Sequence, residues 1–238
     1  MARVREYKIQ TLASFLALLE REKRVEENRG RKADFLFRGQ DVDEPLVPTL
    51  ARRRLRGALP NIERLMLNEF ERVTPPLREL PINNDWDLLA VAQHYGLPTR
   101  LLDWTFSATA ALWFVVRNPP ARDVKSKPRD GVVWVLKPST DDFVDIRTKE
   151  TPFEGKRTRI FRPAVIARRI AAQAGVFTVH KLLAGKRLSH SRETVSSQLS
   201  LRRFMYPPAL SRRGLVKKCV NEIRREPSPR AGSLHVRR

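Results

Sequence analysis

The chain has 238 residues, 41% of them hydrophobic and 31% charged, which suits one globular domain of ordinary size and leaves little room for a second. Its single cysteine, Cys219, excludes an internal disulfide framework and a cluster of thiolate metal ligands, and this usage favours the reducing cytoplasm. The first residues lack the apolar segment of a signal peptide, and the longest apolar run, residues 108–116, is far shorter than the ~20 residues that span a bilayer. We therefore expect a cytoplasmic protein with no membrane partner.

The net charge of +21 is unevenly distributed along the chain. Residues 181–238 hold 15 Lys and Arg against three Glu, a net charge of +12, whereas residues 1–180 carry +9. A basic tail of this kind binds phosphate backbones without sequence specificity, so nonspecific nucleic acid is one expected partner. The Pro, Ser, Gly and Arg content of residues 224–238 is equally typical of a solvated, partly disordered terminus.

The first elements in chain order are a helix and a strand. Residues 11–27 carry apolar side chains at the spacing of one helix face, which predicts an N-terminal helix, within residues 1–30, that packs on the domain. Residues 35–39 predict a short strand that ends in a turn, since aromatic residues favour strands and glycine interrupts them. This puts Arg38 at a strand end, beside Gly39, which we expect either to adopt a positive φ or to let a ligand approach the backbone.

The next segment, residues 41–60, has three prolines and predicts an irregular surface loop with one helical turn. Its basic residues are candidates for contacts with nucleic-acid phosphates: Arg52, Arg53, Arg54 and Arg56. From residue 61 to about residue 73 an amphipathic helix is expected, with one apolar side formed by Ile62, Leu65, Met66, Phe70 and Val73.

Residues 84–118 combine two predicted helices with a short loop that is rich in polar residues. A helix is predicted from Asp85 to residue 95, and a second, apolar on nearly every side, from Thr105 or Ser107 to residue 116. Between them the segment LPTRLLDW is expected to be a loop held against the core, with Arg100 close to Asp103. Polar groups in such a place need partners, so we expect Asp103 to be buried.

Further along, residues 132–136 predict a central strand, because five apolar residues in succession imply cover on both faces. Residues 143–146 predict a neighbouring strand, 147–163 mostly loop, 165–174 a helix, and 176–180 a strand. This succession predicts an α+β fold, a single domain with a small central sheet surrounded by helices.

Three segments, FLFRGQ at 35–40, QHYGLPTRLLDW at 93–104 and RRIAAQAGVFT at 168–178, resemble the FRG-domain family of bacteria and their viruses, which is named after a Phe-Arg-Gly motif. The resemblance implies an FRG-like domain over residues 31–180. It ends there, and the segment 181–238, low in acid and rich in arginine, diverges from the family, as a truncated or frameshifted end would. The resemblance names a domain and implies no particular reaction.

Within the family-like region, polar residues gather at predicted element ends and resemble a pocket lining. The candidate catalytic residues are Arg38, Asp103 and Gln173. The candidate ligand-binding residues are Gly39, Gln40, Gln93, His94, Thr99, Arg100, Thr105 and Ser107. Each also has a structural alternative: Arg38 or Arg100 would pair with Asp103 to lock the loops, and His94 would cap a helix. The histidines lack nearby carboxylates at metal-ligand spacing, so no metal site is predicted.

The order of these residues is also similar in outline to that of ADP-ribosyltransferases. The similarity implies that Arg38 holds the phosphate or ribose of NAD, that Thr105 and Ser107 support the nicotinamide side, and that NAD is a substrate with no further cofactor required. Gln173 stands where those enzymes have a glutamate, which leaves Asp103 as the alternative acid or the site as one that only binds. Whether the fold is ADP-ribosyltransferase-like stays open, because fold analogy does not establish function.

Three hypotheses follow. The first is an enzyme, or a pocket derived from one, that acts on NAD or another nucleotide as an ADP-ribosyltransferase-like toxin or as an effector in phage defence. The second is a nucleic-acid-binding protein that acts through the basic loop and tail, although no known reader motif is present. The third is a non-catalytic module that binds a ligand or a protein. The sequence identifies neither a substrate nor an oligomeric state.

Overall fold

Two small β-sheets form the framework of the computed structural model, which describes residues 5–30, 34–53, 55–75, 82, 84–119, 121–145, 150–154, 157–163, 175–180 and 200–206. The strands are β1 Arg5–Lys8, β2 Leu36–Gln40, β3 Leu101–Trp104, β4 Gly131–Lys137, β5 Arg159–Phe161, β6 Val176–Val179 and β7 Ser200–Tyr206. The helices are α1 Leu12–Glu27, α2 Thr49–Arg52, α3 Leu59–Val73, α4 Asp85–His94 and α5 Ala108–Val116, with a 3-10 turn at Thr140–Asp142.

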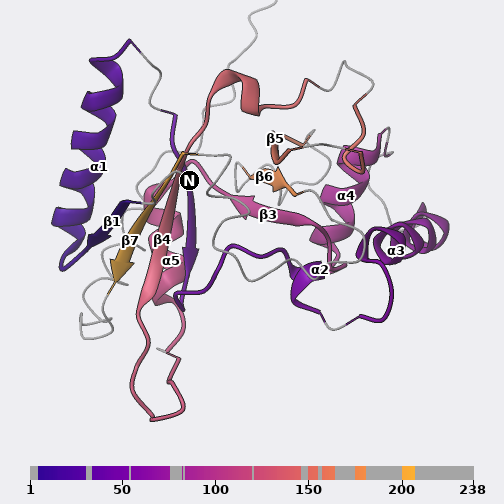
Figure 1. Cartoon of the computed structure of the whole chain (residues 1–238), viewed down its shortest axis with the longest axis horizontal. Coiled ribbons are helices and arrows are strands. Elements are labelled where there is room, and N and C mark those ends of the chain that lie inside the picture. The colour runs from indigo at the N-terminus through magenta and orange to yellow at the C-terminus, as the bar shows by residue number, and fades with distance from the viewer. Residues whose placement is uncertain are drawn as a thin grey trace, which may run out of the picture.

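The first sheet has the strand order β1-β7-β4-β2, and the second has the order β3-β6-β5 (Figure 1). The pair β1 and β7 is parallel, whereas all other neighbours are antiparallel. The two sheets meet where Phe37 and Thr105 exchange backbone hydrogen bonds of 2.7 and 2.9 Å. This junction brings the end of β3 next to β2, and so brings Asp103 close to Arg38.

Helices and sheets stack in four layers. Helices α1 and α5 cover one face of the first sheet, where Phe37, Val133 and Phe204 join their core. The opposite face, with Leu36 and Trp134, packs against Leu102 and Trp104 of the second sheet. Helices α3 and α4 close the far face of the second sheet, and Figure 1 shows them at the end of the molecule opposite α1. Since side chains alternate along a strand, Arg38 lies on the same face of β2 as Leu36, the face between the two sheets.

The α+β class is confirmed, as are the helices predicted from residues 11, 61 and 85 and the strands at 35–39, 132–136 and 176–180. The strand β4 is buried along nearly its whole length, as expected for a central strand. Ser107 is the N-cap of α5, since its side chain accepts a hydrogen bond from the Ala110 N–H.

Several expectations were wrong. The segment LPTRLLDW is not all loop, because its last four residues form β3, and the chain builds two sheets where one was expected. Residues 143–145 make a single bridge to Ile160 instead of a strand, and β5 lies within the expected loop 147–163. Strands β1 and β7 were not predicted. The helix predicted at 165–174 lies outside the described residues.

The apolar side predicted for α3 is also rotated from the observed one. The residues that α3 buries are Glu63, Leu67 and Phe70, whereas Leu65 and Val73 are exposed. The helix thus turns an acidic residue toward the core, where it meets β3. Among the described residues, no helix is both long and apolar enough to cross a membrane.

Candidate functional site

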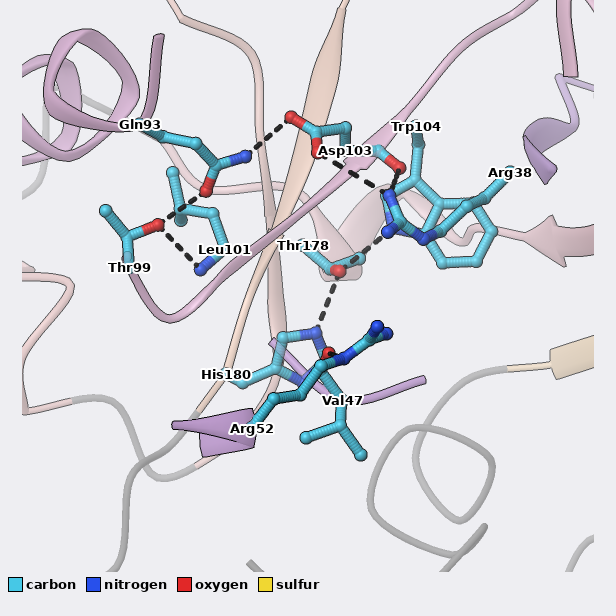
Figure 2. A network of polar contacts seen from close by, with 10 residues as sticks. All are labelled: Arg38, Val47, Arg52, Gln93, Thr99, Leu101, Asp103, Trp104, Thr178 and His180. Atoms are coloured by element: carbon cyan, nitrogen blue, oxygen red, sulfur yellow. Dashed lines mark hydrogen bonds and ion pairs between the residues drawn. The ribbon is translucent and has the colours of Figure 1, made fainter. Parts of the chain in front are cut away.

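Arg38 stands at the junction of the two sheets, with its side chain only 20% exposed. Its Nη1 donates a hydrogen bond of 2.8 Å to the backbone carbonyl of Asp103, and the same atom lies 3.5 Å from Asp103 Oδ2. Its Nε is buried and has no hydrogen-bond partner among the described residues. In Figure 2 the dashed lines from the guanidinium lead to Asp103. Within the described part of the chain, one edge of this largely buried guanidinium therefore keeps an unused donor.

Asp103 is held from its other side by α4. Gln93 Nε2 donates to Asp103 Oδ1 at 2.6 Å, and Gln93 Oε1 accepts from the Thr99 hydroxyl at 2.5 Å (Figure 2). The Thr99 hydroxyl in turn accepts from the Leu101 backbone N–H at 3.2 Å. We call Arg38, Gln93, Thr99 and Asp103 the Arg38 network. It unites four of the predicted site residues.

Asp103 itself is not buried, contrary to expectation, since its side chain is 63% exposed. The reason is the strand that replaces the predicted loop: in β3 the neighbours Leu102 and Trp104 point into the core between the sheets, so Asp103 points away from that core.

A second arginine adds positive charge beside the network. Arg52, at the end of α2, is exposed, and its Nε donates to the Val47 carbonyl at 2.8 Å. Burial lowers the pKa of Arg38 below its ordinary value, the Asp103 carboxylate acts in the opposite direction, and the Arg52 charge lowers it further. An arginine nevertheless stays protonated in proteins. Arg52 thus adds positive charge near Arg38, whose ion-pair partner Asp103 is mostly in solvent.

A buried polar chain lies on the inner side of the site. The Trp104 indole N–H donates to Thr178 Oγ1 at 2.9 Å, and the same hydroxyl lies 2.9 Å from His180 Nε2. Burial lowers the pKa of His180 to about 3, and the charges of Arg38 and Arg100 act in the same direction. His180 is therefore neutral at physiological pH and leaves the positive charge to the arginines. Sequence reasoning missed both Thr178 and His180.

Of the two structural alternatives, the pair of Arg38 with Asp103 is present, whereas Arg100 pairs with Glu63. The Arg100 side chain is 2% exposed, its Nη2 lies 2.5 Å from Glu63 Oε2, and its Nη1 donates to the Pro152 carbonyl at 3.0 Å. The guanidinium also lies 5.0 Å from the centre of the Phe153 ring. Arg100 is thus enclosed by protein groups that match its charge and its donors. Glu63 was missed, although its position four and seven residues before Leu67 and Phe70 places it on the same helix face.

Gly39 serves a different purpose from either of the two predicted. It is not among the glycines with positive φ, and a Cβ atom on it would lie 1.8 Å from the Ala111 carbonyl oxygen. The space beside Gly39 is occupied by α5, so its lack of a side chain allows the helix to pack on β2.

The remaining candidates lie around the network with partners of their own. Gln40 Oε1 accepts from the Trp134 indole at 2.6 Å, and Thr105 Oγ1 accepts from the Ser107 N–H at 3.1 Å. His94 is exposed in the last turn of α4, with its ring edge-on to Tyr95. In the basic loop Arg53 and Arg56 are exposed. Gln173 and Arg54 lie outside the described residues.

No group of three or more His, Cys, Asp or Glu able to hold a metal ion occurs in the part of the chain that the structure describes.

In comparisons with known proteins, residues 33–124 match the family model of the FRG domain. No curated protein and no solved structure matches the chain. The matched range includes both segments, 35–40 and 93–104, on which most of the resemblance rests, and it contains all four residues of the Arg38 network. The chain therefore carries an FRG domain, and the Arg38 network lies within it.

Proposed function

We propose that the FRG domain binds a phosphate-bearing, nucleotide-type ligand at the Arg38 network, with Arg52 as a second positive group. The observation that carries the proposal is the state of Arg38. Its guanidinium is largely buried, and its Nε has no hydrogen-bond partner among the described residues. The Asp103 carboxylate lies 3.5 Å away, and the positive charge of Arg52 lowers the Arg38 pKa further. A buried donor left without a partner costs stability, so its presence needs an explanation.

Within the described part of the chain two other arginines also have a buried Nε without a partner, and each lies closer to a carboxylate than Arg38 does. Arg203 pairs with both Glu6 and Asp43. Arg159 lies 3.2 Å from Glu150 and donates to the Asp141 carbonyl at 2.7 Å. The acceptors at Arg38 are the Asp103 carbonyl at 2.8 Å and the Asp103 carboxylate at the longer distance of 3.5 Å, and the positive charge of Arg52 lowers the Arg38 pKa. An anion near Arg38 and Arg52 would add negative charge there and would offer an acceptor to Arg38 Nε, which has none among the described residues.

The planar guanidinium fork fits phosphate oxygens with two parallel hydrogen bonds, which favours phosphate over a simple halide. The neutral His180 and the exposed Asp103 suit a ligand that carries both an anionic part and hydrogen-bond donors. These features together favour a nucleotide, and NAD is the form that the outline similarity to ADP-ribosyltransferases suggests. In that form Asp103 is the acid nearest to Arg38, and the domain would act as a toxin or antiviral effector.

Nucleic acid is the second candidate, and one observation favours it. Arg52, Arg53 and Arg56 are all exposed on the loop next to the network, where a phosphate backbone could reach them. Binding of this type would depend steeply on salt, whereas binding of a single nucleotide at Arg38 would depend on salt only weakly.

The test is incubation of the purified chain with NAD, a panel of mono- and dinucleotides, and short single- and double-stranded DNA and RNA. Native mass spectrometry of the protein and analysis of the ligand distinguish binding, turnover and inertness in one series. We expect a nucleotide complex that Arg38→Ala abolishes. Binding of nucleic acid alone, lost on replacement of Arg53 and Arg56 but not of Arg38, would favour the second candidate, and inertness to every probe would reject both.

A further inference from the structure

The hydrogen bonds that end at Asp103 have a defined direction. The Leu101 N–H donates to the Thr99 hydroxyl, so the one hydroxyl proton of Thr99 is free to donate to Gln93 Oε1. The Gln93 amide must then present its NH₂ group to Asp103, because an ionised carboxylate can only accept. The buried Thr99 thereby determines the orientation of the Gln93 amide. The amide in turn holds Asp103 Oδ1 in place through its hydrogen bond.

This arrangement is hard to explain by stability. Asp103 is 63% exposed, and exposed ion pairs contribute little to folding because water solvates the separated charges well. Thr99, which lies at the far end of this series of hydrogen bonds from Asp103, is nevertheless fully buried. Supporting groups that orient a solvent-facing carboxylate are typical of binding and catalytic sites, where a ligand group must meet the carboxylate in a fixed place.

The oriented carboxylate still has unused acceptor capacity. An ionised carboxylate has about four lone-pair sites. Oδ1 accepts from Gln93, and among the described residues Oδ2 has only the long 3.5 Å contact to Arg38. The same oxygens would repel a bare phosphate group placed directly on them. A hydroxyl group beside the phosphate would instead be attracted.

We infer that Asp103 reads a hydroxyl group of the ligand, that Gln93 and Thr99 are positioning residues for Asp103, and that the ligand class is a phosphorylated ribose rather than phosphate alone. This rests on the proposed function, since Arg38 and Arg52 would hold the phosphate. Gln93 and Thr99 then act through Asp103 and make no ligand contact of their own.

The experiment compares adenosine 5′-monophosphate with its 2′,3′-dideoxy analogue, two probes with the same phosphate and base. Dissociation constants are measured by ligand-observed NMR or calorimetry for the parent chain and for Asp103→Asn, Gln93→Met and Glu69→Gln. Glu69 is the matched control, because it is 61% exposed and pairs with Arg72 at 2.6 Å, away from the site. Circular dichroism verifies that each variant is folded.

We expect the parent chain to bind the ribose probe about tenfold more tightly than the dideoxy probe, as a charge-assisted hydrogen bond implies. This ratio should fall to about one in Asp103→Asn, fall partway in Gln93→Met, and stay unchanged in Glu69→Gln. Equal binding of both probes by the parent chain, or a ratio that survives in Asp103→Asn, overturns the inference while the proposed function stands. If neither probe binds the parent chain, the proposed function fails and the inference fails with it.

Discussion

Arg38 and Arg100 are both largely buried arginines of the FRG domain, yet their surroundings give them different roles. Arg100 has the Glu63 carboxylate at 2.5 Å, the Pro152 carbonyl at 3.0 Å and the Phe153 ring 5.0 Å from its guanidinium. Protein groups therefore balance its charge and accept its hydrogen bonds. Arg38 donates to the Asp103 carbonyl at 2.8 Å, but its ionic contact is long at 3.5 Å, and its buried Nε has no partner among the described residues. We therefore assign structure to Arg100 and ligand binding to Arg38.

The pair of Glu63 and Arg100 should be among the most sensitive positions for stability. Glu63→Gln keeps the shape but leaves the Arg100 charge uncompensated in the interior, which we expect to lower the free energy of unfolding by ~3–5 kcal/mol. Urea denaturation measures this directly. Glu69→Gln, which breaks an exposed pair on the same helix, serves as control and should leave the midpoint unchanged. Equal effects of the two substitutions would refute the buried assignment.

His180 should make the protein sensitive to acid. Its pKa is lowered to about 3 in the folded chain, below the ordinary 6.5, so the unfolded chain binds the proton first. The stability that the neutral form contributes is present above pH 6.5 and is lost as the pH falls toward 3. We expect a loss of about 2 kcal/mol between pH 7 and pH 5.

The measurement is the difference between the unfolding free energies at pH 7 and pH 5, which does not depend on how stable each variant is overall. His180→Asn should reduce the difference by that amount. His94→Gln, which replaces an exposed histidine, should leave it unchanged. An undiminished difference in His180→Asn would mean that other groups cause the acid sensitivity.

At the scale of elements, β2 and α5 pack closely against each other at Gly39. A Cβ atom on Gly39 would meet the Ala111 carbonyl at 1.8 Å, a backbone contact that only movement of the whole helix can relieve. We expect Gly39→Ala to cost ~3 kcal/mol of stability, at the upper end of ordinary overpacking, and to shift the Thr105 to Ser107 turn. Gly175→Ala, where nothing lies within 4 Å of the added atom, should be nearly neutral. Thermal unfolding of the two variants compares them, and a stable Gly39→Ala would show that α5 packs less closely.

Elements with a clear period could be predicted from the sequence, and elements defined by distant partners could not. Helix α1 and strand β4 carry their own patterns, an apolar stripe in one and five successive apolar residues in the other. Strand β7 includes two arginines at its centre, and it becomes a strand because β1 and β4 supply hydrogen bonds on both sides. Such pairing between residues nearly 200 positions apart leaves no local signal.

The site divides in the same way. The residues of the Arg38 network could be identified because they stand at element ends inside a recognisable motif. Their connections could not be, since Asp103 was expected in a buried loop and faces solvent from a strand. The partner of Arg100 was missed because the predicted apolar side of α3 left Glu63 on the surface, whereas the observed buried side includes it. Geometry between elements, rather than residue type, decides these pairings.

For the whole molecule, the FRG match does not mark the limits of the folded unit. The family model covers residues 33–124, yet the first sheet requires β7 at residues 200–206 as the strand between β1 and β4. Phe204 also fills the core between α1 and the sheet, within 5.4 Å of the Phe15 ring. Strand β7 thus contributes to the domain, although it lies outside the range that the family model matches.

A chain that ends at residue 199 should therefore lose cooperative unfolding, because β1 loses its only described strand neighbour and α1 loses part of its core. A chain that ends at residue 223 keeps β7 and should unfold cooperatively. It also lacks five arginines of the tail, so it should bind DNA or RNA nonspecifically less well than the full chain. Differential scanning calorimetry of both truncations tests this, and a cooperative transition in the shorter one would show that β7 is dispensable.

The most direct test of the central claim is the affinity of Arg38→Lys for ADP-ribose, measured by calorimetry beside Arg159→Lys. The two arginines are alike in burial, with 20% and 18% of their side chains exposed, and each has a buried Nε without a described partner. Lysine keeps the charge but loses the fork that holds a phosphate with two hydrogen bonds. We predict that Arg38→Lys melts close to the parent chain and binds at least ~10-fold more weakly, while Arg159→Lys binds as the parent chain does. Equal affinities in all three proteins, or the same loss in both variants, would contradict the assignment of Arg38 as the phosphate-binding residue.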